Sequence, residues 1–251
     1  MDRQNRHRIL INSDPKNRER VFENVYEDLY LEKQKQEGHV RPPARRRQKR
    51  ISIFKSIIGQ GHERILEVGC GLGDLTYNLV DNAKQVVGVD ISASALEFAK
   101  NRRNLWSMDD DQVEKIEFVQ MSAVQLKFPP ESFDCAVSTS VIEHLHPDDV
   151  EIHLREVWRV LKPNGQYLVW CPNRLGHHRD RVEHLSMLTY SELMKKMERE
   201  GFRDFRSTVM NRPPLVDARF KIFMEKLLST LRVKILWSHL GVRNILLVAL
   251  K

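Results

Sequence analysis

A glycine-rich turn at the end of a short apolar strand constrains this 251-residue chain more than any other feature. The turn lies in the sequence RILEVGCGLGD, which begins at Arg64. Its three alternating glycines are Gly69, Gly71 and Gly73. Glycine lets the backbone bend sharply and lets a ligand come close, because no Cβ stands in the way. A second apolar run, 85–90, ends in Asp90, 17 residues after Gly73. Two neighbouring parallel strands that end in this way are typical of a site for a nucleotide-type ligand. Asp90 would hold the ribose hydroxyls of that ligand.

The spacing of the glycines indicates which nucleotide is bound. A dinucleotide site uses G-x-G-x-x-G, whereas this chain has G-x-G-x-G with Glu67 two residues before the first glycine. This pattern resembles motif I of the class I S-adenosylmethionine-dependent methyltransferases. A pyrophosphate is bound by bare amides at a helix N-terminus, but a carboxylate suits the ammonium and sulfonium of S-adenosyl-L-methionine. We therefore expect S-adenosyl-L-methionine as the cofactor.

Apolar runs and helical patterns alternate along the chain. Strands are expected at 64–68, 85–90, 116–121, 133–138, 166–171, 202–209 and 244–250, with helices at 74–82, 93–103, 147–161 and 189–201 between them. Such alternation predicts a mostly parallel sheet covered on both faces. The resemblance implies an α/β, Rossmann-like, doubly wound, seven-stranded sheet whose last strand runs antiparallel.

Positive charge is concentrated in two segments outside this pattern. Residues 1–50 hold 14 Lys/Arg against 8 Asp/Glu, and residues 212–243 hold 7 against 2, whereas 51–211 has a net charge of −5. We expect 1–50 to be a basic helical N-terminal extension. Residues 51–251 would form the methyltransferase domain, with a basic amphipathic insertion at about 212–243. Segregated charge of this kind indicates an anionic partner or surface.

Helices are expected in both basic segments. Tyr26 and Tyr30 lie on a predicted helix at 15–37, and in the family such helices often close over the active site. We therefore expect both tyrosines to bind substrate, the alternative being plain packing on the core. Residues 219–240 carry an apolar stripe flanked by basic side chains. This segment is either a lid or core element, or a helix lying on an anionic membrane surface.

The chain contains no apolar run near the ~18 residues of a membrane span. Its three cysteines, Cys70, Cys135 and Cys171, fall in or beside predicted strands and are expected to be reduced and buried. No apolar stretch follows the first residues, so we expect a cytoplasmic protein. The alternative for 219–240 would place it at the inner membrane surface.

The resemblance assigns cofactor contacts residue by residue. Glu67, Gly69 and Gly71 would line the methionine end, Asp90 would bind the ribose, and Ile91 would lie against the adenine. Ser122 stands where many relatives place an aspartate on the adenine amino group. The full expected set is Glu67, Gly69, Cys70, Gly71, Gly73, Asp90, Ile91, Ser122, Ala123 and Ser138.

Catalytic candidates follow the fourth strand. Glu143-His144-Leu145 resembles the Glu-His-Leu of many quinone and small-molecule methyltransferases. His144 would act as the general base, because an imidazole with an ordinary pKa of ~6.5 suits proton transfer near neutral pH. His184 is the second candidate, and Glu143 and Asn173 are expected to contact substrate. Alternatively, Glu143 and His144 only orient the loop.

Some relatives bind a metal through E-x-x-E-H. In this chain the first position of that pattern is Ser140, so the ligand set is incomplete. His146, His177, His178 and Asp180 could complete a site, but histidines in loops are usually plain polar residues. We therefore assign no metal ligands, and whether a metal is used stays open.

Taken together, these features predict a methyltransferase that acts on a small-molecule, lipid or glycan acceptor, most readily on oxygen. One alternative is an RNA methyltransferase whose basic arm, 45–50, grips phosphates. The acidic core and the lack of an N/D-P-P-Y/F motif after the fourth strand argue against a nucleic-acid partner. A second alternative is an S-adenosylmethionine-binding protein without activity.

Overall fold

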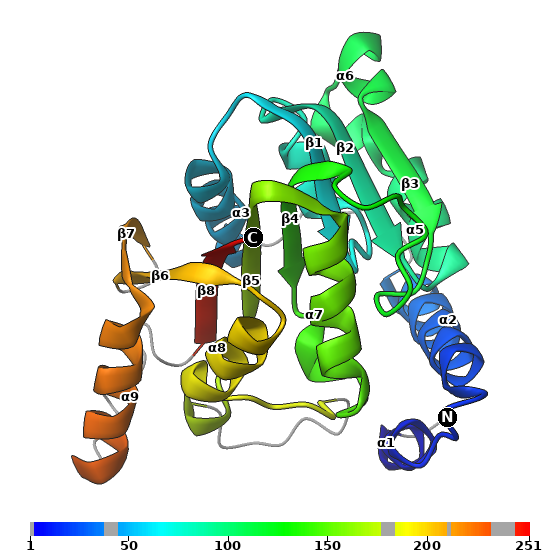
Figure 1. Ribbon diagram of the computed structural model, residues 1–251. Coiled ribbons are helices and arrows are strands. Elements are labelled where there is room, and N and C mark those ends of the chain that lie inside the picture. Colours follow the sequence, from blue (N-terminus) through cyan, green and yellow to red (C-terminus); the bar gives the residue numbers. More distant parts are fainter. Residues whose placement is uncertain (1–2, 38–44, 177–183, 210–211, 232–243) are drawn as a thin grey trace.

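The computed structural model describes residues 3–37, 45–176, 184–209, 212–231 and 244–251. Its centre is one eight-stranded sheet with the order β3-β2-β1-β4-β5-β8-β6-β7 (Figure 1). The strands are β1 His62–Val68, β2 Ala83–Asp90, β3 Ile116–Gln120, β4 Phe133–Thr139, β5 Leu161–Pro172, β6 Arg203–Val209, β7 Arg212–Asp217 and β8 Asn244–Leu250. β1 to β5 run parallel, and β8 is antiparallel between β5 and β6. The doubly wound fold with an antiparallel last strand is thus confirmed.

The sheet has one strand more than the seven predicted. The additional strand, β7, pairs antiparallel with β6 at the edge of the sheet, within the segment that we expected to be a helical insertion. This strand is difficult to predict from the sequence because it contains Pro213 and Pro214, and proline donates no backbone hydrogen bond. An edge strand tolerates proline, since one of its sides needs no partner.

Helices cover both faces of the sheet. They are α1 Arg3–Ile11, α2 Arg18–Glu37, α3 Arg45–Ile58, α4 Asp74–Asn78, α5 Ala93–Asn101, α6 Asp110–Glu114, α7 Asp149–Val160, α8 Tyr190–Arg199 and α9 Ala218–Leu231, with short 3₁₀ turns η1 Arg103–Trp106, η2 Ile142–His144 and η3 Arg174–Gly176. α1 and α6 were not predicted, because the first six residues of α1 are polar and α6 has only five residues. Side-chain caps from Ser92 and Thr189 begin α5 and α8.

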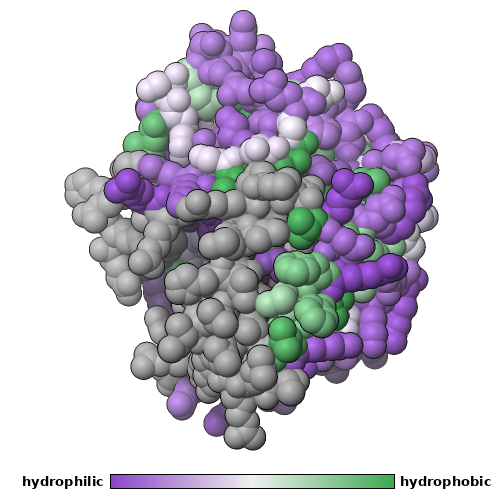
Figure 2. All heavy atoms as spheres, turned by 90° about the vertical axis from the view of Figure 1, so that its left-hand side faces the viewer, coloured by the Kyte–Doolittle hydropathy of each residue, from purple (hydrophilic) through white to green (hydrophobic). Residues whose placement is uncertain are grey.

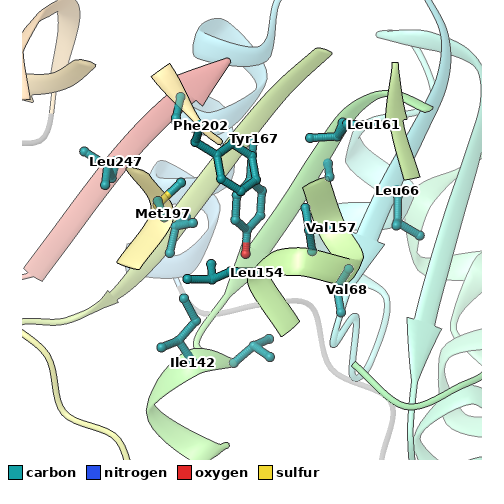
Figure 3. Close-up of a cluster of buried hydrophobic side chains, with 14 of the residues drawn as sticks. Leu66, Val68, Ile142, Leu154, Val157, Leu161, Tyr167, Met197, Phe202 and Leu247 are labelled. Carbon is teal, nitrogen blue, oxygen red and sulfur yellow. The ribbon is translucent and has the colours of Figure 1, made fainter. Parts of the chain in front are cut away.

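Alternate residues of the same strand are buried on opposite faces of the sheet, each under a different pair of helices. Ile65 belongs to the cluster that packs under α3 and α4 with Phe54, whereas Leu66 belongs to the cluster under α7 and α8. Figure 3 shows the second cluster, in which Tyr167 and Met197 meet between β5 and α8. Strand side chains point to opposite faces in turn, so a strand buried on both sides reads as a continuous apolar run.

The apolar stripe predicted for 219–240 faces outward in the part of it that the structure describes. Phe220, Phe223 and Leu227 of α9 are 45%, 60% and 38% exposed, while Ala218 and Lys221 are buried residues of this helix. Figure 2 views the molecule from the α9 side and shows hydrophobic side chains on that surface. Residues 232–240 of the predicted helix lie outside the described residues. Within the described ranges, no helix is long and apolar enough to cross a bilayer.

Candidate cofactor and acceptor site

Two neighbouring cavities lie at the carboxyl ends of β1, β2 and β4, where a doubly wound sheet places its ligand. The larger has a volume of about 630 Å³ and is walled by α2, by the loops after β2, β3 and β4, and by the start of α7. The smaller has a volume of about 220 Å³ and lies between α3 and the glycine turn. Four residues line both cavities: Tyr30, Gly69, Ser140 and His144. Most of the predicted cofactor and acceptor residues line one or both of these adjoining cavities.

The glycine turn is tied to the end of β2. The amides of Gly69 and Cys70 donate to the Val89 carbonyl at 2.8 and 2.9 Å, and the Gly71 amide donates to Asp90 Oδ2 at 2.8 Å. Gly69 and Gly71 have φ of 70° and 52°, a left-handed conformation that favours glycine. Asp90 also lines the larger cavity. The predicted ribose acid therefore holds the turn in shape while facing the space where a ribose would lie.

Glu67 lies near the end of β1 as a buried carboxylic acid beside the smaller cavity. Its Oε2 accepts a hydrogen bond from Thr76 Oγ1 at 2.5 Å. Burial raises the pKa of Glu67 to about 8, because the charged form loses its hydration. A cationic ligand would stabilise the carboxylate form. Glu67 and the bare glycine turn together fit the ammonium end of S-adenosyl-L-methionine.

This pKa leads to a pH-dependent affinity. Below pH 8 Glu67 is mostly protonated in the free protein, and a cationic cofactor requires the carboxylate. The Kd for S-adenosyl-L-methionine should therefore fall by about tenfold per pH unit between pH 6 and 7.5, with uptake of the cofactor releasing about one proton. Calorimetry in buffers of different ionisation enthalpy measures both quantities. In Glu67→Gln the slope should vanish and the affinity at pH 7.5 should drop about tenfold or more; an unchanged slope would contradict the assignment.

Helix α2 covers the cavities and is tied down on both sides of the larger one. Glu27 accepts hydrogen bonds from Ser92 Oγ at 2.7 Å and from the Ser94 amide at 3.2 Å. At the other side, Arg18 pairs with Asp149 at 2.7 Å. Since Ser92 and Ser94 follow β2 and Asp149 begins α7, the N-terminal extension bridges the loops that frame the site.

Both tyrosines predicted to bind substrate lie in this wall. Tyr26 lines the larger cavity and meets the His144 ring edge-on, with centroids 6.0 Å apart. The Tyr30 hydroxyl lies over the glycine turn, 2.7 Å from the place where a Cβ on Gly71 would be. Burial raises the pKa of Tyr30 well above its usual range. Its hydroxyl therefore stays protonated near neutral pH and is available as a hydrogen-bond donor.

The basic arm contributes two arginines that sequence reasoning did not assign to the site. Arg47 Nε pairs with the buried Asp74 Oδ2 at 2.9 Å, and Asp74 also pairs with Arg102 at 2.9 Å. The Arg50 guanidinium lies 4.2 Å over the Trp170 ring. Both Arg47 and Arg50 line the smaller cavity. Guanidinium groups there suit a ligand carboxylate, so this part of the arm faces inward rather than outward to a polyanion.

The two predicted bases are neighbours. η2 carries Glu143 and His144, and the Glu143 carbonyl accepts hydrogen bonds from the amides of Leu185 and Ser186 at 2.7 and 3.1 Å. These bonds place His184 against His144, with ring centroids 5.1 Å apart and planes at 80°. Nothing local in the sequence indicates this pairing, because the two histidines are 40 residues apart.

The remaining predicted site residues divide into two groups. Ile91, Ser122 and Ala123 line the larger cavity, and Cys70 lines the smaller one. In the described parts of the chain, five predicted residues are not on the wall of either cavity: Gly73, Ser138, Asn173, Glu143 and His184. The last two flank His144, which is on both walls.

Packing accounts for the position of the first three. A Cβ on Gly73 would lie 2.8 Å from Phe118, so this glycine allows close packing of the turn against β3. Ser138 Oγ bonds the Tyr167 hydroxyl at 2.6 Å within the core. Asn173 Oδ1 accepts from the Leu175 amide at 3.0 Å, which shapes the loop after β5. These three residues therefore contact other parts of the protein and do not face either cavity.

Known proteins resemble this chain both in sequence and in fold. Residues 66–169 match the family described as "Methyltransferase domain". The ubiquinone/menaquinone biosynthesis C-methyltransferase UbiE of Hahella chejuensis is 38% identical over 124 residues, which cover 48% of this chain and 47% of that protein. UbiE of Pseudomonas savastanoi pv. phaseolicola is 38% identical over 125 residues, with 48% and 46% covered. The chain thus spans about half the length of the curated relatives it matches.

Solved structures share the fold at low sequence identity. The Burkholderia thailandensis 1,6-didemethyltoxoflavin-N1-methyltransferase has a TM-score of 0.59 at 18% identity, covering 95% of this chain and 91% of its own. The YcgJ protein of Bacillus subtilis has a TM-score of 0.57 at 19% identity, covering 81% and 98%. The former aligns with nearly the whole chain.

The sheet order, the glycine turn after Glu67 and the acid that ends β2 define a class I methyltransferase fold with a site for S-adenosyl-L-methionine. Together with the match of residues 66–169 to a methyltransferase domain, they support a class I S-adenosylmethionine-dependent methyltransferase that is similar to UbiE over about half of its length. These findings agree with the predicted class of enzyme and with S-adenosyl-L-methionine as its cofactor.

Proposed function

We propose that this protein transfers a methyl group from S-adenosyl-L-methionine to a hydroxyl oxygen on a small, ring-shaped acceptor. The observation that carries the proposal is the larger cavity, which runs from Asp90 and Ser122 to His144. Its wall as a whole is largely apolar; around Phe22 and Ile152 it also carries the charged residues Arg18, Glu19, Asp148 and Asp149. A cavity of about 630 Å³ with a few polar groups suits a small molecule with an apolar ring. A glycan, which is polar all round, fits such a wall less well.

The N-terminal extension contributes to this function as a lid. α2 supplies Phe22, Tyr26 and Tyr30 to the cavity wall and is held at Glu27 and Arg18. A lid of this kind excludes water from the reacting groups. We propose that the extension opens for the acceptor and closes over it.

The proposed reaction is an in-line displacement. The acceptor oxygen attacks the sulfonium methyl carbon, the carbon–sulfur bond breaks with its electron pair going to sulfur, and the hydroxyl proton passes to the imidazole of His144. Positioning accounts for most of the rate, because the methyl donor is already activated. His144 is the polar group between the two cavities that suits this proton transfer.

The proposed methylated atom, oxygen, differs from the atoms named for the similar enzymes. UbiE proteins are named as C-methyltransferases of ubiquinone and menaquinone biosynthesis. The 1,6-didemethyltoxoflavin enzyme is named as an N1-methyltransferase. The test is transfer of labelled methyl groups to a panel of phenols, catechols, hydroquinones and aliphatic alcohols, with the product position read by NMR. O-methyl products from ring hydroxyls are expected. Products methylated only on ring carbon would overturn the choice of oxygen, and label entering only RNA would overturn the small-molecule acceptor.

A second, separable proposal concerns the outer face of α9. Phe220, Phe223 and Leu227 are exposed beside Arg219 and Lys226, an arrangement that suits an anionic lipid surface. Sedimentation with vesicles containing phosphatidylserine should fall at least severalfold for Phe223→Asp. A matched control is the α2 residue Leu31, 38% exposed, whose change to aspartate should leave sedimentation unaltered. Equal loss in both variants, or no sedimentation of the unaltered protein, contradicts membrane binding through α9.

A further inference from the structure

We propose that Glu143, His144 and His184 together bind a divalent transition-metal ion at the edge of the acceptor cavity. One ligand atom from each of the three side chains lies within 4.8 Å of the other two. The chain by itself indicated an incomplete set, because Ser140 replaces the first glutamate of the E-x-x-E-H pattern. The fold supplies the missing ligand from a distant loop, since His184 packs against His144.

The backbone holds this arrangement in place. The amides of Leu185 and Ser186 donate to the Glu143 carbonyl at 2.7 and 3.1 Å, and Ser186 Oγ donates to the Leu145 carbonyl at 2.8 Å. Three hydrogen bonds thus join the segment after His184 to the segment that contains His144. A site whose ligands are positioned before binding loses less conformational entropy when the ligand arrives.

The ligand types suit a catalytic rather than a structural ion. Two histidines and one carboxylate, with the fourth position open, form a known zinc-binding set, and imidazole also suits other divalent transition metals. A tetrahedral ion with bonds of about 2.1 Å holds its ligands about 3.4 Å apart. The observed separations of up to 4.8 Å would therefore close by about 1.4 Å, which side-chain rotation at His144 and His184 provides because both rings are only partly buried.

Charge also favours an ion at this place. Glu143 is 2% exposed, and a carboxylate removed from water requires positive charge or hydrogen bonds close by. Burial and the charge of Arg47 lower the pKa of Arg50, and Glu143 lies near enough to oppose this shift. A divalent cation would be a stronger counter-charge, directly at the carboxylate oxygen.

The location of the ion indicates its role in methyl transfer. This role rests on the proposed function. His144 lines both cavities, so an ion bound to it borders the space assigned to the acceptor hydroxyl. A metal ion that coordinates a hydroxyl lowers its pKa and favours the oxyanion. With the ion bound, the His144 nitrogen would be a ligand, and the hydroxyl proton would leave to water instead of to His144. Ser140, which also lines both cavities, has a hydroxyl where the E-x-x-E-H pattern has a carboxylate. The open coordination position is thereby left to water or the acceptor.

Metal binding is tested on the full chain with Zn²⁺ by calorimetry and with Co²⁺ by visible absorption, in the presence and absence of S-adenosylhomocysteine. One Zn²⁺ per chain is expected, with tetrahedral Co²⁺ bands. The Kd for Zn²⁺ should rise at least tenfold in His184→Ala and in Glu143→Gln. The control is His62→Gln, at the start of β1, whose ring contacts the Ile58 carbonyl and which should bind Zn²⁺ as the unaltered chain does. Melting temperature and S-adenosylhomocysteine affinity verify that each variant is folded.

Three outcomes would overturn the site: no Zn²⁺ binding by the folded protein, equal binding by His184→Ala, or equal loss in His62→Gln. For the role in the reaction, treatment with a chelator should lower methyl transfer at least tenfold, and Zn²⁺ or Mn²⁺ should restore it. Full turnover in excess chelator would overturn that role. Failure of the proposed function can be distinguished from failure of the metal site. In that case Zn²⁺ would still bind, but no hydroxyl acceptor would be methylated.

Discussion

His144→Ala is expected to lower kcat for methyl transfer by about 10²–10⁴-fold. The reason is its position: the imidazole lies between the cofactor end and the acceptor end, against Tyr26 on one side and His184 on the other. Whether His144 takes the proton itself or holds the ion that acidifies the hydroxyl, its loss removes the group that deals with this proton. Single-turnover rates with a saturating hydroxyl acceptor measure the effect.

The affinity for S-adenosyl-L-methionine separates this effect from structural damage. Gly69, Glu67 and Asp90 bind the cofactor in our assignment, so the Kd of His144→Ala should stay within about threefold of the unaltered protein. His62→Ala, remote from the cavities, should keep both rate and affinity. A variant that raises only the acceptor KM, with kcat intact, would show that His144 positions the acceptor and takes no part in proton transfer.

Gly69→Ala is expected to abolish cofactor binding at accessible concentrations, with a loss of about 100-fold or more in affinity. Gly69 has φ of +70°, and a Cβ there would lie 2.4 Å from Val141 Cγ2. The left-handed conformation costs a non-glycine residue about 1–2 kcal/mol. The overlap adds to this cost, since it displaces either the turn or the segment that begins η2. We expect a loss of about 2–4 kcal/mol in the free energy of unfolding.

Two further variants separate the contributions. Gly61 has φ of +87°, and apart from its chain neighbours no described residue has an atom within 4 Å of the place that its Cβ would occupy. Gly61→Ala therefore bears the backbone cost alone and should bind the cofactor normally. The double variant Gly69→Ala/Val141→Ala removes the overlapping methyl group and should recover part of the stability, as a coupled pair does. Calorimetric affinity and denaturant unfolding measure both. Equal damage from Gly61→Ala, or no recovery in the double variant, would contradict the steric explanation.

Most strands were predicted to within a few residues because each is a short apolar run bounded by polar residues. β1 and β4 are buried on both faces and are easily recognised in this way. β7 was missed, because two prolines in six residues contradict strand propensity and only pairing with β6 makes it a strand. Helix α1 was missed because its apolar residues are confined to its last three positions, too few to show helical spacing. Leu10 and Arg6 are nevertheless buried in the fold.

Arg47 and Arg50 show why a charged segment is difficult to interpret. The run at 45–50 is equally consistent with phosphate binding and with an internal role, since positive charge alone does not state which way a helix faces. Burial of Ile51 and Phe54 against the sheet orients α3, and the two arginines are thereby turned toward the smaller cavity.

The donor side that we propose for this protein could be predicted from the sequence itself. Glu67, the glycine turn and Asp90 act within single strand ends, where local backbone requirements and two adjacent parallel strands are enough to define the site. The acceptor side was decided by tertiary structure. His184 reaches His144 across 40 residues, and α2 forms the wall through contacts with the loops after β2 and at α7. Residue propensity and hydrophobic periodicity act over a few positions, whereas the surfaces that meet across a cavity are selected by packing of the whole chain.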